Sequence, residues 1–397
     1  MTEPVSTADA GVVRRLSTLD RYLPIWILLA MAAGLLLGRT FGGLNDTLDT
    51  IKIDTVSLPI ATGLFAMMYP VLAKVKYSKI GEVAADRKLI GTSLVLNWIV
   101  GPAVMFALAW MMLPDLPAYR TGLIIVGLAR CIAMVLIWND LACGNGEAAA
   151  VLVALNSVFQ VVAYAILGWF YLDGLPGWLG LDSGTALDIS MWAIAKTVLI
   201  FLGIPLLAGY LTRLWGERVK GVEWYETVFL PKIGPVALWG LLYTVVIMFA
   251  LQGETITSKP FDVVRIALPL LAYFGIMWFG SFFTGYRMRF TYDKNTAMAF
   301  TAAGNNFELA IAVGIGVFGI ASGEALATVV GPLIEVPALI ALVYAALWAR
   351  RRFYTSNGSS RSATSTERCV SPTASSTRPD APSAKERSRR PTRGSWR

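Results

Sequence analysis

Two short stretches decide the fold, Gly127-Leu-Ala-Arg-Cys131 and Gly304-Asn-Asn-Phe-Glu308. Each lies near the middle of a long apolar run, where a membrane-spanning helix ordinarily carries no ionisable side chain. An ionisable residue at that depth costs several kcal/mol unless it is paired or faces water, so such residues usually mark a transport path. The two stretches therefore predict a protein that carries a solute through a membrane.

The composition excludes a soluble globular protein. Of the 397 residues, 56% are hydrophobic and only 15% are charged, and the mean hydropathy is +0.60. The formal net charge is +8, but the basic residues lie between apolar blocks and in the C-terminal tail, so we expect no nucleic-acid partner. Because the chain has no histidine, any proton transfer must rest on carboxylates. Cys131, Cys143 and Cys369 form no CxxC pair and are interpreted as reduced thiols.

Apolar runs of about 20 residues, the length that a bilayer core requires, recur along the chain. They cover residues 22–40, 56–75, 89–113, 119–141, 147–172, 188–212, 229–251, 262–284, 295–319 and 325–349. The first run is followed by Gly-Arg rather than by an Ala-x-Ala cleavage site, so we expect it to remain as the first span. The sequence thus predicts an all-α membrane protein with ten spans in the lipid bilayer.

The Lys and Arg residues of the short loops predict the orientation. If the N-terminus is cytoplasmic, eighteen of these residues fall in inside segments and five in outside segments. Cytoplasmic loops carry an excess of basic residues, so this bias places both termini in the cytoplasm. We expect a multi-pass protein of the inner (plasma) membrane.

Four parts are expected along the chain. A cytoplasmic tail covers residues 1–20, a first five-helix repeat covers 21–172, a second covers 188–350, and a C-terminal tail covers 355–397. The C-terminal tail is basic, rich in Ser, Thr and Pro, and almost without large apolar residues. Such a segment cannot bury enough surface to fold, so we expect it to be disordered.

A shift of 177 residues aligns the fourth and fifth apolar runs with the ninth and tenth. It places Gly127 on Gly304, Cys131 on Glu308, and Gly146-Glu-Ala on Gly323-Glu-Ala. Because each half holds five spans, an odd number, the second half must be inserted in the opposite orientation. This inverted-repeat arrangement is typical of secondary transporters, whose sites lie near the bilayer midplane where discontinuous helices meet.

Cys131 and Glu308 are the main candidates for the site. A lone cysteine in a span is more often a small buried hydrophobic residue, but the alignment with Glu308 and the neighbouring Arg130 favour a function. The structural alternative for Glu308 is a carboxylate neutralised by a helix partner, for which Arg130 is the obvious candidate. For Arg130 itself, a structural and a functional interpretation both remain open. Cys143 lies about 18 Å along a continuous helix from Cys131, too far for both thiols to bind one small ligand.

Other polar residues follow at helical spacing. Trp138 is seven residues after Cys131 and on the same face, and Asn156 and Gln160 share a face of the fifth span. The two amides either take part in transport or tie helices together. Glu335 lies between two prolines of the tenth span and is predicted to belong to the transport path or its proton relay.

Three stretches resemble the arsenical-resistance-3 family of arsenite efflux permeases. They are Arg130-Cys-Ile-Ala-Met-Val-Leu-Ile-Trp138, Asn305-Asn-Phe-Glu-Leu-Ala-Ile-Ala312 and Gly331-Pro-Leu-Ile-Glu-Val-Pro337, and the first two are specific for that family. The likeness covers roughly residues 20 to 350. The family belongs with the bile acid/sodium symporters, so the resemblance implies two inverted five-helix repeats with discontinuous helices 4 and 9 crossing at the midplane.

For function, the resemblance implies export of arsenite, As(III), in exchange for protons, and some members of the family also carry antimonite. The essential cysteine of the family matches Cys131, which is the expected As(III) ligand, and its essential acid matches Glu308. The other polar site positions that we carry over are Arg130, Trp138, Asn156, Asn305, Asn306 and Glu335.

The chemistry agrees with a carrier. As(III) is thiophilic and its trihydroxide is neutral, so a single thiolate can bind it and still release it. The chain has no GxxxxGK[ST] loop, so we expect neither ATP use by the chain itself nor a cofactor, and an accessory ATPase or a homo-oligomer stays open.

Two other functions are possible for a chain of this kind. A sodium-coupled organic-anion carrier on the same fold would need clustered carboxylates and amides for Na⁺ and would not need Cys131. An intramembrane enzyme lacks support, because the chain has no Ser/His/Asp set, no HExxH and no paired aspartates at membrane depth. We therefore expect a transporter rather than an enzyme.

Overall fold

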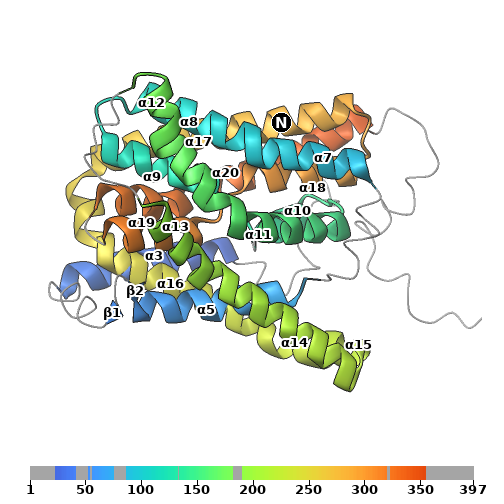
Figure 1. Ribbon diagram of the computed structural model, residues 1–397. Coiled ribbons are helices and arrows are strands. Elements are labelled where there is room, and N and C mark those ends of the chain that lie inside the picture. Colours follow the sequence, from blue (N-terminus) through green and yellow to red (C-terminus); the bar gives the residue numbers. More distant parts are fainter. Residues whose placement is uncertain are drawn as a thin grey trace, which may run out of the picture. The chain divides into compact units, whose positions relative to one another are not determined.

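The computed structural model describes residues 23–41, 52–53, 56–75, 86–132, 134–181, 190–319 and 322–354. These residues lie in the unit Thr18–Asn357 and are almost entirely helical (Figure 1). The two predicted tails, 1–20 and 355–397, lie outside the described residues. The α-helices are α3 (Leu23–Thr40), α5 (Leu58–Ala73), α7 (Arg87–Val95), α8 (Gly101–Met112), α9 (Pro117–Leu128), α10 (Met134–Leu141), α11 (Gly146–Trp169), α12 (Leu175–Trp178), α13 (Met191–Val198), α14 (Ile204–Lys220), α15 (Val222–Trp224), α16 (Leu230–Ser258), α17 (Pro260–Arg287), α18 (Tyr292–Ala303), α19 (Phe307–Phe318) and α20 (Gly323–Ala349).

Short elements complete the chain. Two strands, β1 (Lys52–Ile53) and β2 (Val56–Ser57), form an antiparallel pair directly before α5. The π-helical turns are η2 (Leu96–Val100), η3 (Phe170–Gly174), η4 (Leu199–Gly203), η5 (Tyr225–Phe229) and η6 (Arg350–Tyr354).

The predicted spans appear in three forms. Among the described residues, six continuous helical segments are long and apolar enough to cross a membrane: Arg87–Met112, Gly146–Trp178, Met191–Lys220, Val222–Gly253, Pro260–Arg287 and Gly323–Tyr354. The first two predicted spans are the shorter apolar helices α3 and α5, and the fourth and ninth are interrupted. Apart from the two short strands, the described residues therefore confirm a helical, multi-pass membrane protein.

Four of the long segments contain a π-helical turn that ends two residues before a proline. A proline inside an α-helix clashes with the carbonyl four residues earlier and removes a hydrogen bond, whereas the wider π-turn relieves this crowding. The prolines therefore do not end these spans. They are Pro102 after η2, Pro176 after η3, Pro205 after η4 and Pro231 after η5.

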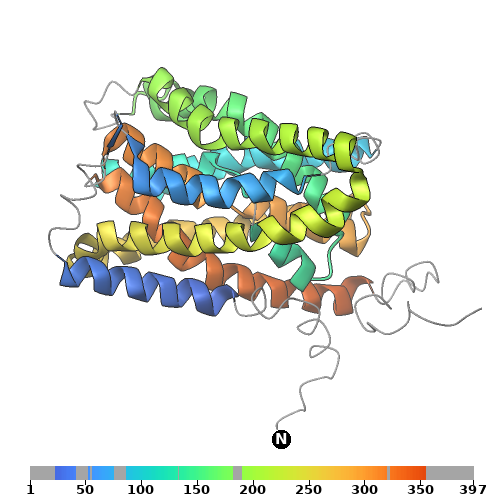
Figure 2. The same cartoon turned by 90° about the horizontal axis from the view of Figure 1, so that it is seen from below.

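One group of helices is held together by close backbone contact. Helix α16 packs along α3 and α5, and α14 packs along α5 (Figure 2). A Cβ atom on Gly34 would lie 2.6 Å from the carbonyl oxygen of Val246, and one on Gly240 would lie 2.6 Å from the amide nitrogen of Met67. Small residues permit such approach between membrane helices, where packing rather than hydrophobic exclusion drives association.

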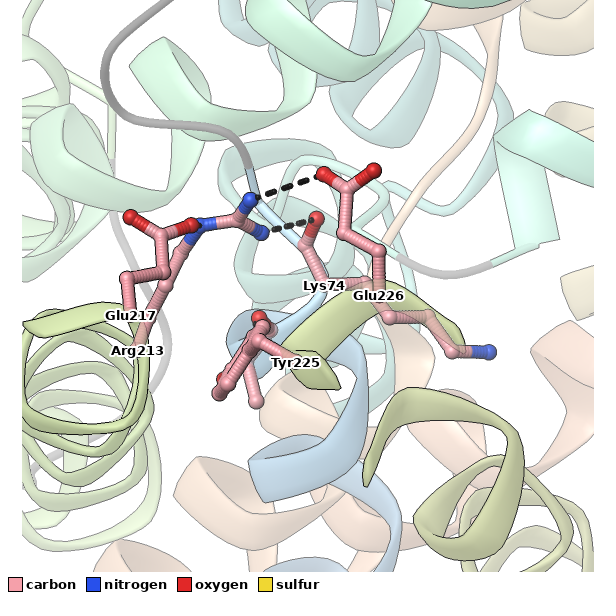
Figure 3. A network of polar contacts seen from close by, with 6 residues as sticks. Lys74, Arg213, Glu217, Tyr225 and Glu226 are labelled. Carbon is pink, nitrogen blue, oxygen red and sulfur yellow. Dashed lines mark hydrogen bonds and ion pairs between the residues drawn. The ribbon is translucent and has the colours of Figure 1, made fainter. Parts of the chain in front are cut away.

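A buried arginine joins three members of this group (Figure 3). The Arg213 guanidinium of α14 pairs with Glu217 at 2.7 Å and with Glu226 at 3.2 Å, and donates to the carbonyl oxygen of Lys74 at 3.2 Å. The hydroxyl of Tyr225 donates to the last carbonyl of α5 at 3.1 Å. These donors satisfy carbonyls that the end of α5 leaves without an intrahelical partner.

The remaining helices pack around the two interrupted spans. Helix α9 packs along α8 and α20, α17 packs along α18 and α20, and α19 packs along α20. Helix α13 contacts α11 and α19 and continues through η4 into α14, so it connects this set to the group around α16. In Figure 1, α9 and α19 lie toward one end of the helices, and α10 and α18 lie toward the other.

Candidate functional site

The two interrupted spans meet at their breaks. Helix α9 ends at Leu128 and α18 ends at Ala303, and each is followed by extended backbone. Across the gap the amide of Cys131 donates to the carbonyl oxygen of Gly304 at 3.3 Å, and the amide of Asn306 donates to that of Ala129 at 3.1 Å. Non-helical backbone at membrane depth must find partners inside the protein, and here each break supplies them to the other.

Two asparagines complete the crossing. The side-chain amide of Asn305 donates to the carbonyl oxygens of Val126 at 2.8 Å and Ala129 at 3.1 Å, so it covers the end of α9. The side-chain oxygen of Asn306 accepts from the amide of Leu309 at 3.1 Å and caps the start of α19. Both predicted site residues therefore stabilise the break through these hydrogen bonds, independently of any contact with a solute.

The crossing corrects the alignment of the two stretches. The bridge between Arg130 and Asn305 joins residues 175 apart, and the first and last residues of α9 and α18 differ by the same interval. The shift of 177 that places Cys131 on Glu308 holds further along, where α11 begins at Gly146 and α20 begins at Gly323. Two additional residues between the second break and α20 account for the difference. Cys131 and Glu308 are thus not equivalent at the crossing.

The equivalence of Cys131 with Asn306 is also visible in what their side chains do. The sulfur of Cys131 accepts a hydrogen bond from the amide of Val135 at 3.3 Å, in the first turn of α10. Asn306 accepts in the same way at the start of α19. Cys131 therefore places its sulfur at the N-terminal end of α10.

Arg130 is fully buried and binds oxygens other than those of the carboxylates. Its guanidinium donates to the Tyr273 hydroxyl at 2.8 Å, to the Ala302 carbonyl oxygen at 3.4 Å and to that of Gly127, while its backbone amide donates to the Gln160 side chain. No described Asp or Glu forms an ion pair with it. The interpretation of Arg130 as the partner that neutralises Glu308 is therefore wrong.

The two candidate carboxylates share one pocket. Glu308, in the first turn of α19, is half-buried, and Glu335, in α20, is 4% exposed. Both line a pocket with an empty volume of about 460 Å³, counted to its open mouth. Met134 of α10 and Thr244 of α16 contribute to the same wall, and the rest of the lining is mainly apolar. The pocket thus lies between the broken spans and the group around α16.

The pocket is tied directly to the crossing. The backbone amide of Asn305 donates to the carboxylate of Glu335, while the second carboxylate oxygen is buried without a hydrogen-bond partner among the described residues. Cys131 is 3% exposed and lies within electrostatic range of Glu335 and Glu308, but it is not part of the pocket lining. In this conformation the sulfur is near the carboxylates and covered.

The last two predicted site residues lie apart from the pocket lining. Trp138 is fully buried in α10, and its indole N–H has no partner among the described residues. Asn156 of α11 accepts from the Trp98 indole at 3.1 Å and donates to the Asn97 side chain at 3.4 Å, so it ties α11 to η2. The helix-tying interpretation of this amide therefore has direct geometric support.

Sequence reasoning missed two residues that the structure brings to the site. Tyr273 binds the Arg130 guanidinium, and Thr244 lines the same pocket as the two carboxylates. Neither carried a signal, because a single Tyr or Thr within an apolar span is ordinary in a membrane helix. The spacing of Gln160 places it on the same face as Asn156, but the sequence does not indicate its partner, the backbone amide of Arg130.

Comparisons with known proteins show the family of the chain. Residues 61–259 match the Sodium Bile acid symporter family. The chain is 58% identical to the arsenical-resistance protein Acr3 of Corynebacterium glutamicum over 343 residues, which cover 86% of this chain and 92% of the relative. It is 35% identical to an uncharacterised transporter of Synechocystis sp. over 83% of this chain and 88% of the relative. It is 32% identical to Acr3 of Alkaliphilus metalliredigens over 82% of this chain and 91% of the relative. The chain belongs to the arsenical-resistance-3 (Acr3) family of the bile acid/sodium symporter superfamily.

Proposed function

We propose that this protein exports arsenite from the cytoplasm in exchange for protons. The observation that carries the proposal is the pocket that Glu308 and Glu335 both line. It lies beside the break of the fourth span, where the sulfur of Cys131 caps the first turn of α10. At this crossing a soft sulfur provides a ligand for As(III), and two titratable carboxylates provide groups that bind protons. The names of the two Acr3 relatives support the cargo.

The architecture that we propose is ten transmembrane helices in two inverted five-helix repeats, 21–172 and 188–350. Support comes from α9 and α18, which are both 12 residues long and pair through the symmetric hydrogen bonds of the breaks. The excess of basic residues in alternate loops supports cytoplasmic termini and insertion in the inner membrane. Rocking of one group of helices against the other would open the pocket to each side in turn.

The thiol chemistry is a ligand exchange. The Cys131 sulfur bonds to arsenic as one hydroxyl of As(OH)3 leaves, and the thiol proton leaves with that hydroxyl as water. Attack of water on arsenic in the opposite sense breaks the S–As bond and regenerates both As(OH)3 and the thiol. Because Cys131 is covered here, loading requires a conformation in which the segment before α10 opens toward the pocket.

The carboxylates provide the coupling. We propose that Glu308 is deprotonated while arsenite loads and that a proton from outside reaches it before release, with Glu335 as the neighbouring relay. This role is supported by the buried oxygen of Glu335 that has no hydrogen-bond partner among the described residues. Antimonite has the same thiophilic chemistry and is proposed as a second cargo.

The test is uptake of arsenite into everted membrane vesicles with an acidified lumen. The native chain should accumulate arsenite. The uptake rates of Cys131→Ser and Glu308→Gln should be at least about tenfold lower, a difference equivalent to about 1.4 kcal/mol. Cys143→Ser is the matched control, since Cys143 lies outside the pocket and should keep the native rate. Equal uptake by all four chains would contradict the proposal.

The same vesicles separate the rival function. A sodium-coupled organic-anion carrier would respond to a Na⁺ gradient and would tolerate Cys131→Ser. Uptake that depends on Na⁺ and not on pH would therefore favour that alternative. A purified protein reconstituted alone in liposomes would show whether an accessory ATPase is needed.

A further inference from the structure

The strongest unexplained feature is a buried positive charge at the crossing. The Arg130 side chain is 0% exposed, and one of its guanidinium nitrogens, Nε, has no hydrogen-bond partner among the described residues. A buried charge costs several kcal/mol unless its surroundings compensate it. Since no described carboxylate pairs with it, the compensation must come from elsewhere.

The compensation comes from the C-terminal ends of two helices. Both α9 and α18 end at the crossing, and the last carbonyls of a helix lack intrahelical partners and carry the equivalent of about half a negative charge. The guanidinium donates to the carbonyl oxygen of Gly127 in the last turn of α9 and to that of Ala302 in the last turn of α18. One cation therefore bridges two negative helix ends.

The two carbonyls are equivalent positions of the two broken spans. Gly127 and Ala302 are 175 residues apart. The same interval separates Ala129 from Gly304, whose carbonyl oxygens accept the two backbone hydrogen bonds across the crossing. The guanidinium thus lies between the C-terminal ends of α9 and α18, at equivalent positions of the two helices. The Tyr273 hydroxyl, at 2.8 Å, adds a third oxygen.

In secondary transporters, unwound backbone carbonyls and the C-terminal ends of half-helices are the groups that coordinate a coupling cation. We propose that the Arg130 guanidinium is a tethered cation that occupies this position permanently, so that the protein needs no Na⁺. The inference rests on the proposed function only in taking the protein to be a transporter. It assigns Arg130 a positioning role, because the guanidinium touches helix ends rather than the cargo.

The surrounding residues leave room for the Arg130 guanidinium and bind the neighbouring carbonyls. A Cβ atom on Gly101 would lie 2.7 Å from a terminal nitrogen of the guanidinium and 3.2 Å from the Tyr273 oxygen, so only glycine leaves the necessary room. Asn305 covers two neighbouring carbonyls, those of Val126 and Ala129. Four carbonyl oxygens at the crossing are therefore already bound by donors of the chain itself.

The decisive test uses the purified full chain in detergent and needs no arsenite. Arg130→Ala should lower the midpoint of thermal unfolding, and millimolar methylguanidinium should restore it by a few degrees, with Na⁺ giving a smaller recovery and choline none. The native midpoint should be the same in all three salts. If Arg130→Ala unfolds at one temperature in all three salts, the proposal is wrong.

Arg120→Ala is the matched control. Arg120 is also a buried arginine and donates to a carbonyl, that of Pro114 at 3.1 Å, but it lies at the start of α9 rather than at the crossing. Its loss should destabilise the protein without any selective recovery in methylguanidinium. Equal recovery by Arg120→Ala would overturn the proposal, because the cation would then act without a specific site.

Transport gives a second readout that does not depend on the folding of Arg130→Ala. Replacement of Na⁺ by choline on both sides of the vesicles should leave the native uptake rate unchanged, and a Na⁺ requirement would overturn the inference. Arg130→Lys should retain more uptake than Arg130→Gln, because it keeps the charge. If no arsenite uptake is seen but methylguanidinium rescues the stability of Arg130→Ala, the proposed function fails and the tethered cation stands.

Discussion

The side-chain amide of Asn305 donates a hydrogen bond to the carbonyl oxygen of Val126 over 2.8 Å. One interrupted span thereby closes the end of the other, and the backbone amide of the same asparagine reaches the Glu335 carboxylate in the pocket. The stability of the crossing and the placement of a candidate proton carrier therefore depend on one residue. Substitutions that change the stability of the crossing and the placement of Glu335 separately are therefore informative.

Replacement of Asn305 should destabilise the protein. Asn305→Asp keeps the size but removes both donated hydrogen bonds and places carboxylate oxygens against two carbonyl oxygens, at a cost of about 1–3 kcal/mol. The midpoint of thermal unfolding in detergent should fall accordingly. Thr62→Ala, which removes an exposed hydroxyl bound only within its own helix, should change the stability by less than about 0.5 kcal/mol. A stable Asn305→Asp variant would show that the crossing does not need this cap.

Two substitutions of Glu335 should separate proton coupling from structure. Glu335→Gln keeps an oxygen that accepts from the Asn305 amide, so the stability should stay close to native while the response of uptake to lumenal pH is lost. Glu335→Ala removes the acceptor as well and should lower both. The measurement is arsenite uptake against lumenal pH, together with thermal unfolding.

The control for this pair is another buried acid of the same helix. Glu324 is 5% exposed in the first turn of α20 and is not part of the pocket. Glu324→Gln should therefore keep the pH response. If Glu335→Gln responds to pH as the native chain does, Glu335 is a structural acceptor and not a relay.

Gly101 offers a steric test of the Arg130 site. Gly101→Ala places a methyl group 2.7 Å from the guanidinium and should displace it, so we expect a loss of uptake of about tenfold or more and a lower unfolding midpoint. Gly91→Ala, in the same apolar segment but with open space around the new methyl group, should gain up to about 1 kcal/mol from helix propensity. A Gly101→Ala protein with native uptake would show that the guanidinium position is not critical.

The sequence predicted the helices better than the contacts between them. Long apolar runs and midplane polar residues suffice to find spans and candidate residues, because a bilayer leaves few alternatives to helices. The partner of Arg130 could not be predicted, since a charged residue in mid-span can satisfy itself on several faces, and here it turns to helix ends and Tyr273. The shift of 177 was detectable only where Gly and Ala matches survive, and it missed the interval of 175 at the breaks. Whether Cys131, Glu308 and Glu335 carry the cargo and the protons stays a prediction.

Asp86 gives a prediction on pH outside the membrane spans. It caps α7 by accepting from the Leu89 amide at 3.2 Å and pairs with Lys294 at 2.6 Å. The hydrogen bond from Lys294 is the main cause that holds the pKa of Asp86 below its ordinary value of 3.8. A group with a lowered pKa contributes stability above that ordinary value, and the contribution is lost as the pH falls through the lowered pKa.

Asp86→Asn isolates the charge, because asparagine can still cap the helix. Both partners of the pair are partly exposed, so the variant should lose no more than about 1 kcal/mol at neutral pH. As the pH falls below 3.8, the midpoints of thermal unfolding of native and variant chains should converge, since the native carboxylate becomes neutral as well. Asp86→Ala also removes the cap and should lie below both at every pH, by roughly 0.5–2 kcal/mol. A difference between native and Asp86→Asn that stays constant over the acid range would mean that the ion pair with Lys294 contributes nothing.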